Sequence, residues 1–327
     1  GEPRIDFKDN TKGSLLLEPT RSNLITYSED FTQWATNATI TPNSSISPDG
    51  TLNASLFSHS GGSFPQVALS GITFVGGSDY IPSLYVKSDG TSQVQHSLLV
   101  NNIVVNFTPT DEWVRISDLI VSPDTSGSFV IAQNSGSSVP ASFYIWGAQL
   151  EQGSYATSYI PTSGSAVTRV TESCNNGANE QVINSTEGVL YLETKGFIDI
   201  PSSSGYIQLS KSGETSFDNS LTIQNRNNGF LRVYVNGSNT ANIHFNENID
   251  FTENHKIAVL YKLNGYKLFI DGVSKSLFGT PTQTVFSGLD NLSFDNRGTL
   301  SWNGSIKDVR VYNTELTDQE LAALTTI

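Results

Sequence analysis

Tight-turn dipeptides recur along the whole chain, and this punctuation constrains the fold more than any other feature of the sequence. Asn-Gly or Asp-Gly occurs at residues 49–50, 89–90, 228–229, 236–237, 264–265, 271–272 and 303–304. Such pairs tolerate the positive φ angles that two-residue hairpin turns require. The runs between them are short and rich in β-branched and aromatic residues. The pattern therefore predicts an all-β chain built from β-sandwiches rather than from alternating strands and helices.

The C-terminal half has the clearest local patterns. Residues 255–271 predict a hairpin of two alternating strands, and residues 305–312 predict another strand. Residues 317–324 predict one short helix, because Thr317 and Glu320 have the spacing of a capping box. Helical periodicity is nearly absent elsewhere, so we expect little other helix.

Length and composition predict two domains. The chain has 327 residues, and a domain typically has ~150. A boundary is expected within residues 163–186, a stretch rich in small and polar residues. We therefore predict an N-terminal domain at 1–170, with a lead-in strand at 4–24, and a C-terminal domain at 180–327. The chain contains no methionine and begins with Gly1, which predicts a fragment or a processed form of a longer protein.

Charge and apolar runs exclude several classes of partner. Lys and Arg number 18 and Asp and Glu number 31, giving a net charge of −13. Nucleic acid is therefore not expected as a partner, because phosphate binding needs a basic surface. No apolar run approaches the ~18 residues that a membrane-spanning helix needs, so membrane insertion is not expected. A single cysteine allows no disulfide within the chain.

Catalytic and metal-binding patterns are weak. The strongest carboxylate group is Glu247, Asp250 and Glu253. Glycosidases need two converging carboxylates, but residues three apart on a strand point to opposite faces. We therefore expect an acidic turn and no enzyme activity. Glu29 and Asp30 precede Phe31 and are candidate ligands for a structural calcium ion; a solvated or helix-capping role is the alternative. No other cofactor is expected.

Sugar binding needs aromatic faces beside fixed polar groups, and four residues are candidates for it. Trp34 lies between two polar stretches, so either an exposed, ligand-contacting position or a buried one remains open. Alternation places Tyr85 and Lys87 opposite an apolar strand face, and it places Gln95 likewise on the neighbouring apolar run. We predict that they share an outer sheet surface. The same residues would also suit a solvated face or an interface between protomers.

Two resemblances extend this interpretation. Residues 256–272 (KIAVLYKLNGYKLFIDG), 304–313 (GSIKDVRVYN) and 315–324 (ELTDQELAAL) resemble a concanavalin A-like, or laminin G-like, lectin domain. Residues 15–34, 111–116 and 143–162 (FYIWGAQLEQGSYATSYIPT) are similar to the jelly-roll, carbohydrate-binding-like modules of bacteriophage virion proteins.

Together these resemblances imply a phage tail-fibre, head-fibre or other adhesin that binds host-surface polysaccharide. They also imply other virion proteins as partners, a homo-oligomer such as a trimer, and a location on the virion. One alternative is a carbohydrate-binding region of a secreted bacterial enzyme that degrades polysaccharides, at the cell surface or outside it. Another is a purely architectural capsid or tail protein. No ligand residue is carried over from either resemblance.

Overall fold

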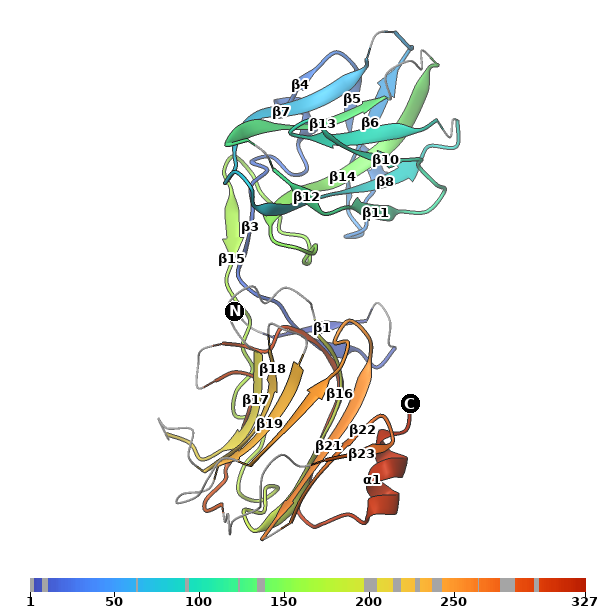
Figure 1. Ribbon diagram of the computed structural model, residues 1–327. Helices are drawn as coiled ribbons and strands as arrows, with labels where there is room; N and C mark the ends of the chain where they lie inside the picture. The colour runs from blue at the N-terminus through green and yellow to red at the C-terminus, as the bar shows by residue number, and fades with distance from the viewer. Residues whose placement is uncertain are drawn as a thin grey trace. The chain divides into compact units, whose positions relative to one another are not determined.

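The computed structural model divides the chain into two compact units (Figure 1). Unit 1 comprises Gly1–Pro19 with Val170–Ile327, and unit 2 comprises Thr20–Arg169. The structure describes residues 3–7, 11–62, 64–91, 94–122, 124–133, 139–196, 205–213, 219–226, 230–236, 243–263, 265–276, 286–296 and 300–327.

Unit 2 is a β-sandwich of two antiparallel sheets. One sheet has the order β10-β9-β13-β7-β4, and the other has the order β11-β8-β14-β6-β5, with β12 also paired to β8. The strands of the first sheet are β10 (Ile103–Phe107), β9 (His96–Val100), β13 (Ser126–Gln133), β7 (Gln66–Thr73) and β4 (Ala35–Thr36). Those of the second are β11 (Val114–Ser117), β8 (Asp79–Ser88), β14 (Ala141–Gln152), β6 (Leu52–His59), β5 (Thr39–Ile46) and β12 (Ile120–Val121). A short ribbon of β3 (Arg21–Asn23) and β15 (Val167–Arg169) and a 3-10 turn, η1 (Phe31–Gln33), complete the unit.

The core of unit 2 lies between its two sheets, and strand alternation places it there. Phe57 on β6 faces Phe143 on β14 across the strand pair, and both side chains are fully buried. Leu98 on β9 and Phe129 on β13 enter the same core from the other sheet. Residues one position away along each strand therefore face outward.

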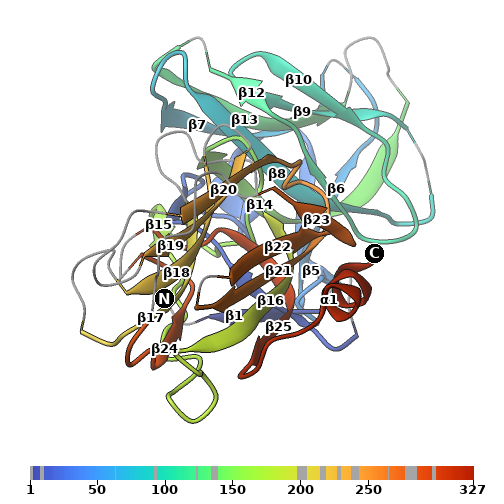
Figure 2. The same ribbon diagram turned by 60° about the horizontal axis from the view of Figure 1, so that its bottom comes forward.

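Unit 1 is a second sandwich. Its larger sheet has the order β1-β2-β25-β16-β21-β22-β23, and its smaller sheet has the order β20-β19-β18-β17-β24 (Figure 2). The first contains β1 (Arg4–Asp6), β2 (Ser14–Leu17), β25 (Gly304–Tyr312), β16 (Glu187–Gly196), β21 (His255–Lys262), β22 (Gly265–Ile270) and β23 (Val273–Lys275). The second contains β20 (Ile243–Asn248), β19 (Phe230–Asn236), β18 (Ser220–Asn225), β17 (Gly205–Ser210) and β24 (Asn291–Ser293).

Both faces of the larger sheet in unit 1 are covered. Ile257, Val259 and Tyr261 on β21 enter the core between the sheets. On the opposite face, Ala258 and Leu260 pack against the helix α1 (Asp318–Thr325). In the smaller sheet, the residues of β17 and β18 are buried on both faces.

Three local predictions are confirmed. β21 and β22 form the expected hairpin, with Lys262 paired to Gly265. The strand expected at 305–312 is β25. The helix begins after Thr317, whose side chain accepts from the Glu320 N–H while the Glu320 carboxylate accepts from the Thr317 N–H. The all-β fold with one short C-terminal helix follows as expected.

Turn chemistry also fixes a hairpin whose sequence signal is weaker. β9 and β10 are joined by Asn101 and Asn102, which both have positive φ, at 51° and 67°. Val100 pairs with Ile103 across this two-residue turn. Asparagine tolerates the left-handed conformation well enough to make the turn without glycine.

The first residues of the chain belong to a different unit from the one that the sequence predicted. We assigned residues 1–170 to one domain, but residues 1–19 belong to unit 1 together with the C-terminal half. The reason is a long-range strand pairing, in which Leu15 and Leu17 on β2 lie beside Ile306 and Gly304 on β25. Glu18 and Glu172 then hold the Arg4 guanidinium between them. Among the described residues, no helix is long and apolar enough to cross a lipid bilayer.

Candidate functional site

Trp34 does not offer a surface for stacking a sugar. Its side chain is 4% exposed and packs on Phe31 and edge-on against Phe129, with ring centroids 5.0 and 5.8 Å away. The indole N–H donates to the backbone carbonyl of Tyr27 at 3.0 Å. The η1 turn directs Trp34 inward. The sequence left both an exposed and a buried position open, and the structure shows the buried one.

Tyr85, Lys87 and Gln95 do not form one surface. Tyr85 and Lys87 lie half-buried on the outer face of the sheet that contains β8. Gln95 is exposed just before β9, which belongs to the opposite sheet. The prediction of a shared surface is therefore wrong, because the chain crosses from one sheet to the other between residues 88 and 96. Tyr85 itself contacts Trp146, at 5.3 Å between ring centroids, and the Arg115 guanidinium.

Glu29 and Asp30 are held by protein donors. The Glu29 carboxylate accepts from the hydroxyl of Tyr159 at 2.9 Å and from the amide of Asn53 at 3.1 Å. Asp30 caps η1 by accepting from the Thr32 N–H at 3.1 Å. Within the described ranges, no group of three or more His, Cys, Asp or Glu side chains could hold a metal ion. Asp30 thus has the helix-capping role that was the alternative to calcium binding, whereas Glu29 accepts hydrogen bonds from two side chains.

The acidic residues near β20 are also engaged within the protein. Glu247 lies 3.7 Å from the Lys275 ammonium. Asp250 lies beyond the end of the strand and accepts from the N–H and hydroxyl of Thr252, at 2.9 and 2.6 Å. These hydrogen bonds lower the pKa of Asp250. Asp250 and Glu253 thus lie in a turn, as predicted, whereas Glu247 lies within β20.

The outer face of the smaller sheet in unit 1 is polar and aromatic across its three central strands. Register places Gln208 of β17 beside Thr222 of β18 and Thr222 beside Tyr234 of β19. The next row aligns Tyr206, Gln224 and Arg232. We call these residues the Gln-Tyr face: Tyr206, Gln208, Thr222, Gln224, Arg232 and Tyr234. The alternate residues of the same strands, such as Ile207 and Ile223, enter the core.

The two glutamines of the Gln-Tyr face hold carbonyl oxygens that lack donors. Gln208 is 0% exposed and Gln224 is 6% exposed. Each amide NH₂ is used, donating to the Thr222 hydroxyl at 3.1 Å and to the Tyr206 hydroxyl at 2.9 Å. Neither Oε1 has a hydrogen-bond partner among the residues that the structure describes. A buried acceptor without a donor costs about 1–3 kcal/mol, so a molecule that donates hydrogen bonds would be stabilised here.

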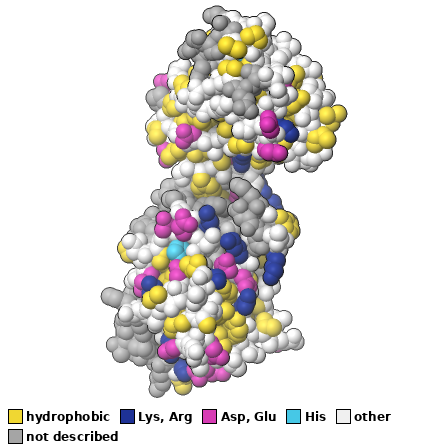
Figure 3. All heavy atoms as spheres, turned by 90° about the vertical axis from the view of Figure 1, so that its right-hand side faces the viewer, with side chains coloured by type: hydrophobic (Ala, Val, Ile, Leu, Met, Phe, Trp, Pro, Cys, Tyr) yellow, Lys and Arg dark blue, Asp and Glu magenta, His cyan; other side chains and the backbone are white. Residues whose placement is uncertain are grey.

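On this face, the Arg232 side chain stacks on the Tyr234 ring. The guanidinium carbon lies 4.1 Å from the centroid of the Tyr234 ring, a cation–π contact. Burial raises the pKa of the Tyr234 hydroxyl, and the adjacent guanidinium opposes the shift without cancelling it. The phenol is therefore neutral across the physiological range. Figure 3 shows that, on the face it presents, charged side chains gather on unit 1 and are sparse on unit 2.

Sequence reasoning missed the Gln-Tyr face. Its signal is glutamine alternating with aliphatic residues in two successive strands, in GYIQLS at 205–210 and SLTIQN at 220–225. Such alternation is equally typical of a solvated sheet face. Only the paired register shows that the two glutamines and two tyrosines lie in adjoining rows.

Comparison with known proteins finds one family model that matches part of the chain. Residues 197–322 match the family model described as the concanavalin A-like lectin/glucanases superfamily. A search of curated proteins finds no match.

Three solved structures are similar at low identity. One is the carbohydrate-binding module CBM40 of the Ruminococcus gnavus IT-sialidase bound to α2,3-sialyllactose (18% identity, 43% of this chain, 84% of that chain, TM-score 0.36). Another is the SAP-like pentraxin of Limulus polyphemus (12%, 46%, 73%, 0.37). The third is the LG4-5 region of mouse laminin α1 (11%, 79%, 89%, 0.31). The similarity to the concanavalin A-like lectin/glucanases superfamily thus lies within unit 1, over residues 197–322.

Proposed function

We propose that this protein binds carbohydrate without cleaving it and that the Gln-Tyr face is the binding surface. The observation that carries the proposal is the pair of buried Oε1 atoms on Gln208 and Gln224 that lack donors. Sugar hydroxyls are donors that can reach two acceptors in adjoining rows. The family match over residues 197–322, whose description includes lectins, supports the same class of ligand.

A neutral glycan is the preferred ligand class. The acceptors of Gln208 and Gln224 favour a group that donates, and a carboxylate cannot donate. The chain's net charge of −13 also repels polyanions. Arg232 then donates to ring or hydroxyl oxygens, while the Tyr234 ring offers an apolar face to the sugar.

We further propose that the chain acts as the adhesin of a bacteriophage virion, bound to host-surface polysaccharide. The support is the resemblance of residues 15–34, 111–116 and 143–162 to phage virion modules. A homo-oligomer such as a trimer would raise the avidity of modest single sites by ~10²–10⁴. The alternative is a carbohydrate-binding region of a secreted enzyme that degrades polysaccharides; an upstream catalytic domain in the parent gene would favour it.

A glycan array probed with the whole chain tests the binding proposal. We expect selective binding to neutral oligosaccharides. Gln208→Leu should lower that binding about tenfold or more, because one hydrogen bond of ~1.4 kcal/mol is lost. The matched control is Gln181→Leu, an exposed glutamine in the same unit. Equal binding by the two variants, or an array on which nothing neutral is bound, would refute the assignment.

A further inference from the structure

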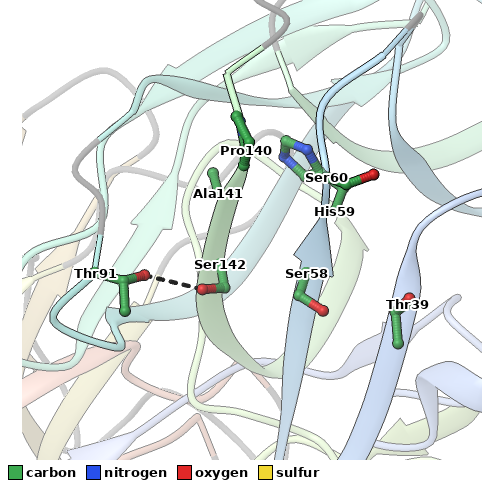
Figure 4. A pocket seen from close by; sticks show the side chains of 8 residues that line it. All are labelled: Thr39, Ser58, His59, Ser60, Thr91, Pro140, Ala141 and Ser142. Atoms are coloured by element: carbon green, nitrogen blue, oxygen red, sulfur yellow. Dashed lines mark hydrogen bonds between the residues drawn. The ribbon is translucent and has the colours of Figure 1, made fainter.

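Unit 2 has a hollow of about 490 Å³ on the outer side of β5, β6 and β14 (Figure 4). Its volume lies within the range of about 300–1,000 Å³ that is typical of small-molecule sites. Its lining residues are mostly hydroxyl-bearing: Thr39, Ser58, His59, Ser60, Thr91, Pro140, Ala141 and Ser142. The hollow lies in unit 2 and the Gln-Tyr face lies in unit 1, so the two have no residue in common.

Strand register aligns three of these hydroxyl groups in a row. Thr39 on β5 pairs with Ser58 on β6, and Ser58 pairs with Ser142 on β14. Their neighbours Phe57 and Phe143 point into the core, so the hydroxyl side chains point outward together. Figure 4 shows the three side chains side by side, with Thr91 at the far end.

Asp89 fixes the protons at one end of the row. The hydroxyls of Ser142 and Thr91 both donate to its carboxylate, and the Thr91 N–H donates to it at 3.0 Å. Each hydroxyl has one proton, so when both donate to Asp89 the two oxygens, which lie 3.0 Å apart, are left as acceptors. Burial raises the pKa of Asp89, but these hydrogen bonds outweigh it and hold the pKa below its usual value. The carboxylate thus stays ionised and the acceptor arrangement is kept.

His59 lies on the core-facing side of β6, where its ring packs edge-on against Phe57 and His96, at 5.6 and 6.0 Å between ring centroids. Its Nδ1 accepts from the Gly61 N–H at 3.2 Å, so in the neutral ring the proton is on Nε2. That Nε2 is buried and has no hydrogen-bond partner in the described part of the chain. Burial lowers the pKa of His59, which favours the neutral ring. Nε2 is therefore closed off from the hollow, and the hollow offers a ligand the fixed acceptors of Ser142 and Thr91.

We infer that this hollow is a second binding site, for a neutral ligand rich in hydroxyl groups such as one sugar residue. A ligand that donates hydrogen bonds can satisfy the Ser142 and Thr91 oxygens together. An anion would meet the Asp89 carboxylate and two oxygen acceptors, in a unit with four basic and ten acidic side chains. A cation finds Asp89 already occupied by three donors.

Saturation-transfer NMR with the whole chain tests the site. The probes are glucose, galactose, mannose, xylose, fucose and N-acetylglucosamine, with N-acetylneuraminic acid as the anionic arm. Thr39→Trp fills the hollow from an exposed strand position. Thr41→Trp is the matched control, because Thr41 is exposed two residues further along the same strand. The background is Gln208→Leu, which weakens the site proposed in unit 1 about tenfold.

We expect at least one neutral probe to bind in the Gln208→Leu background. Thr39→Trp should weaken that binding at least tenfold, and Thr41→Trp should leave it unchanged. In the unsubstituted hollow the probe should shift the His59 ring signals, a readout that depends on no variant at that site. Binding of no neutral probe, equal binding by the two tryptophan variants, or binding of N-acetylneuraminic acid alone would each overturn the inference. Because the Gln-Tyr face is weakened equally in every sample, the comparison of the two tryptophan variants reports on the hollow alone, and its failure leaves the function proposed for unit 1 standing.

Discussion

Acidification should destabilise unit 2 through His96. This ring is 1% exposed and sits among Phe57, Phe107 and Phe143, with its Nδ1 2.7 Å from the Val94 carbonyl oxygen. Burial lowers its pKa from 6.5 to about 4, more than the Val94 hydrogen bond raises it, and nearby His59 lowers it further. The folded state therefore prefers the neutral ring.

The sign and size of the effect follow from linkage. Below pH 6.5 the unfolded chain binds a proton at this position and the folded chain does not, so stability falls until about pH 4. A shift of about 2.5 pKa units, at 1.36 kcal/mol each, corresponds to a loss of about 3 kcal/mol. Above pH 6.5 the full contribution to stability is present. His59, whose pKa is also lowered by burial, adds to the same loss.

Urea unfolding at pH 7 and at pH 4.5 measures this loss, with hydrogen exchange in β9 and β13 reporting on unit 2 alone. His96→Phe removes the titration and keeps a ring among the phenylalanines. It should cost about 1 kcal/mol at both pH values through the lost Val94 hydrogen bond. Between pH 7 and pH 4.5, the free energy of unfolding of His96→Phe should fall by at least 2 kcal/mol less than that of the parent. His255→Asn, in unit 1, is the control. An equal loss in the parent and in His96→Phe would refute the reasoning.

Three further predictions concern the fold. Trp34→Ala should destabilise unit 2 by about 3–5 kcal/mol in thermal or urea unfolding, because it empties a buried site; an unchanged melting temperature would mean that the ring is exposed. Thr317→Ala should cost about 1 kcal/mol through the lost cap, seen as faster hydrogen exchange in α1, and unaltered exchange would contradict it. Arg4→Met should cost about 2 kcal/mol, because it leaves the Glu18 and Glu172 carboxylates buried without their cation. Replacing both glutamates by glutamine in that variant should restore stability, and failure to do so would argue against the ion triad.

Local patterns predicted the elements of this fold well, because turns and alternation are short-range properties. Asp271 and Gly272, for example, have φ of 52° and 79° and join β22 to β23, with Ile270 paired to Val273. Pairing between strands that are far apart in the sequence could not be predicted from local patterns. Nothing local shows that Leu15 lies beside Ile306, and this pairing moves the first residues of the chain into unit 1.

Burial was hardest to predict for side chains near irregular backbone. Trp34 follows a 3-10 turn rather than a strand, so alternation could not show that it points inward. Alternation gave Tyr85 and Gln95 their outward positions, but it does not say to which sheet each strand belongs. The Gln-Tyr face depends on both properties at once, since its two Oε1 atoms matter only when the rows of β17, β18 and β19 are aligned.

Calorimetric titration of Gln208→Leu/Gln224→Leu with a neutral oligosaccharide bound by the parent tests the central claim most directly, when it is paired with urea unfolding of unit 1. Removing two buried acceptors that lack donors offsets the loss of the two amide hydrogen bonds to Thr222 and Tyr206, so the free energy of unfolding should change little. The same change should weaken binding by about a hundredfold, since two hydrogen bonds of ~1.4 kcal/mol are lost. Stable folding with undiminished affinity would contradict the account, because the glycan would then be bound elsewhere.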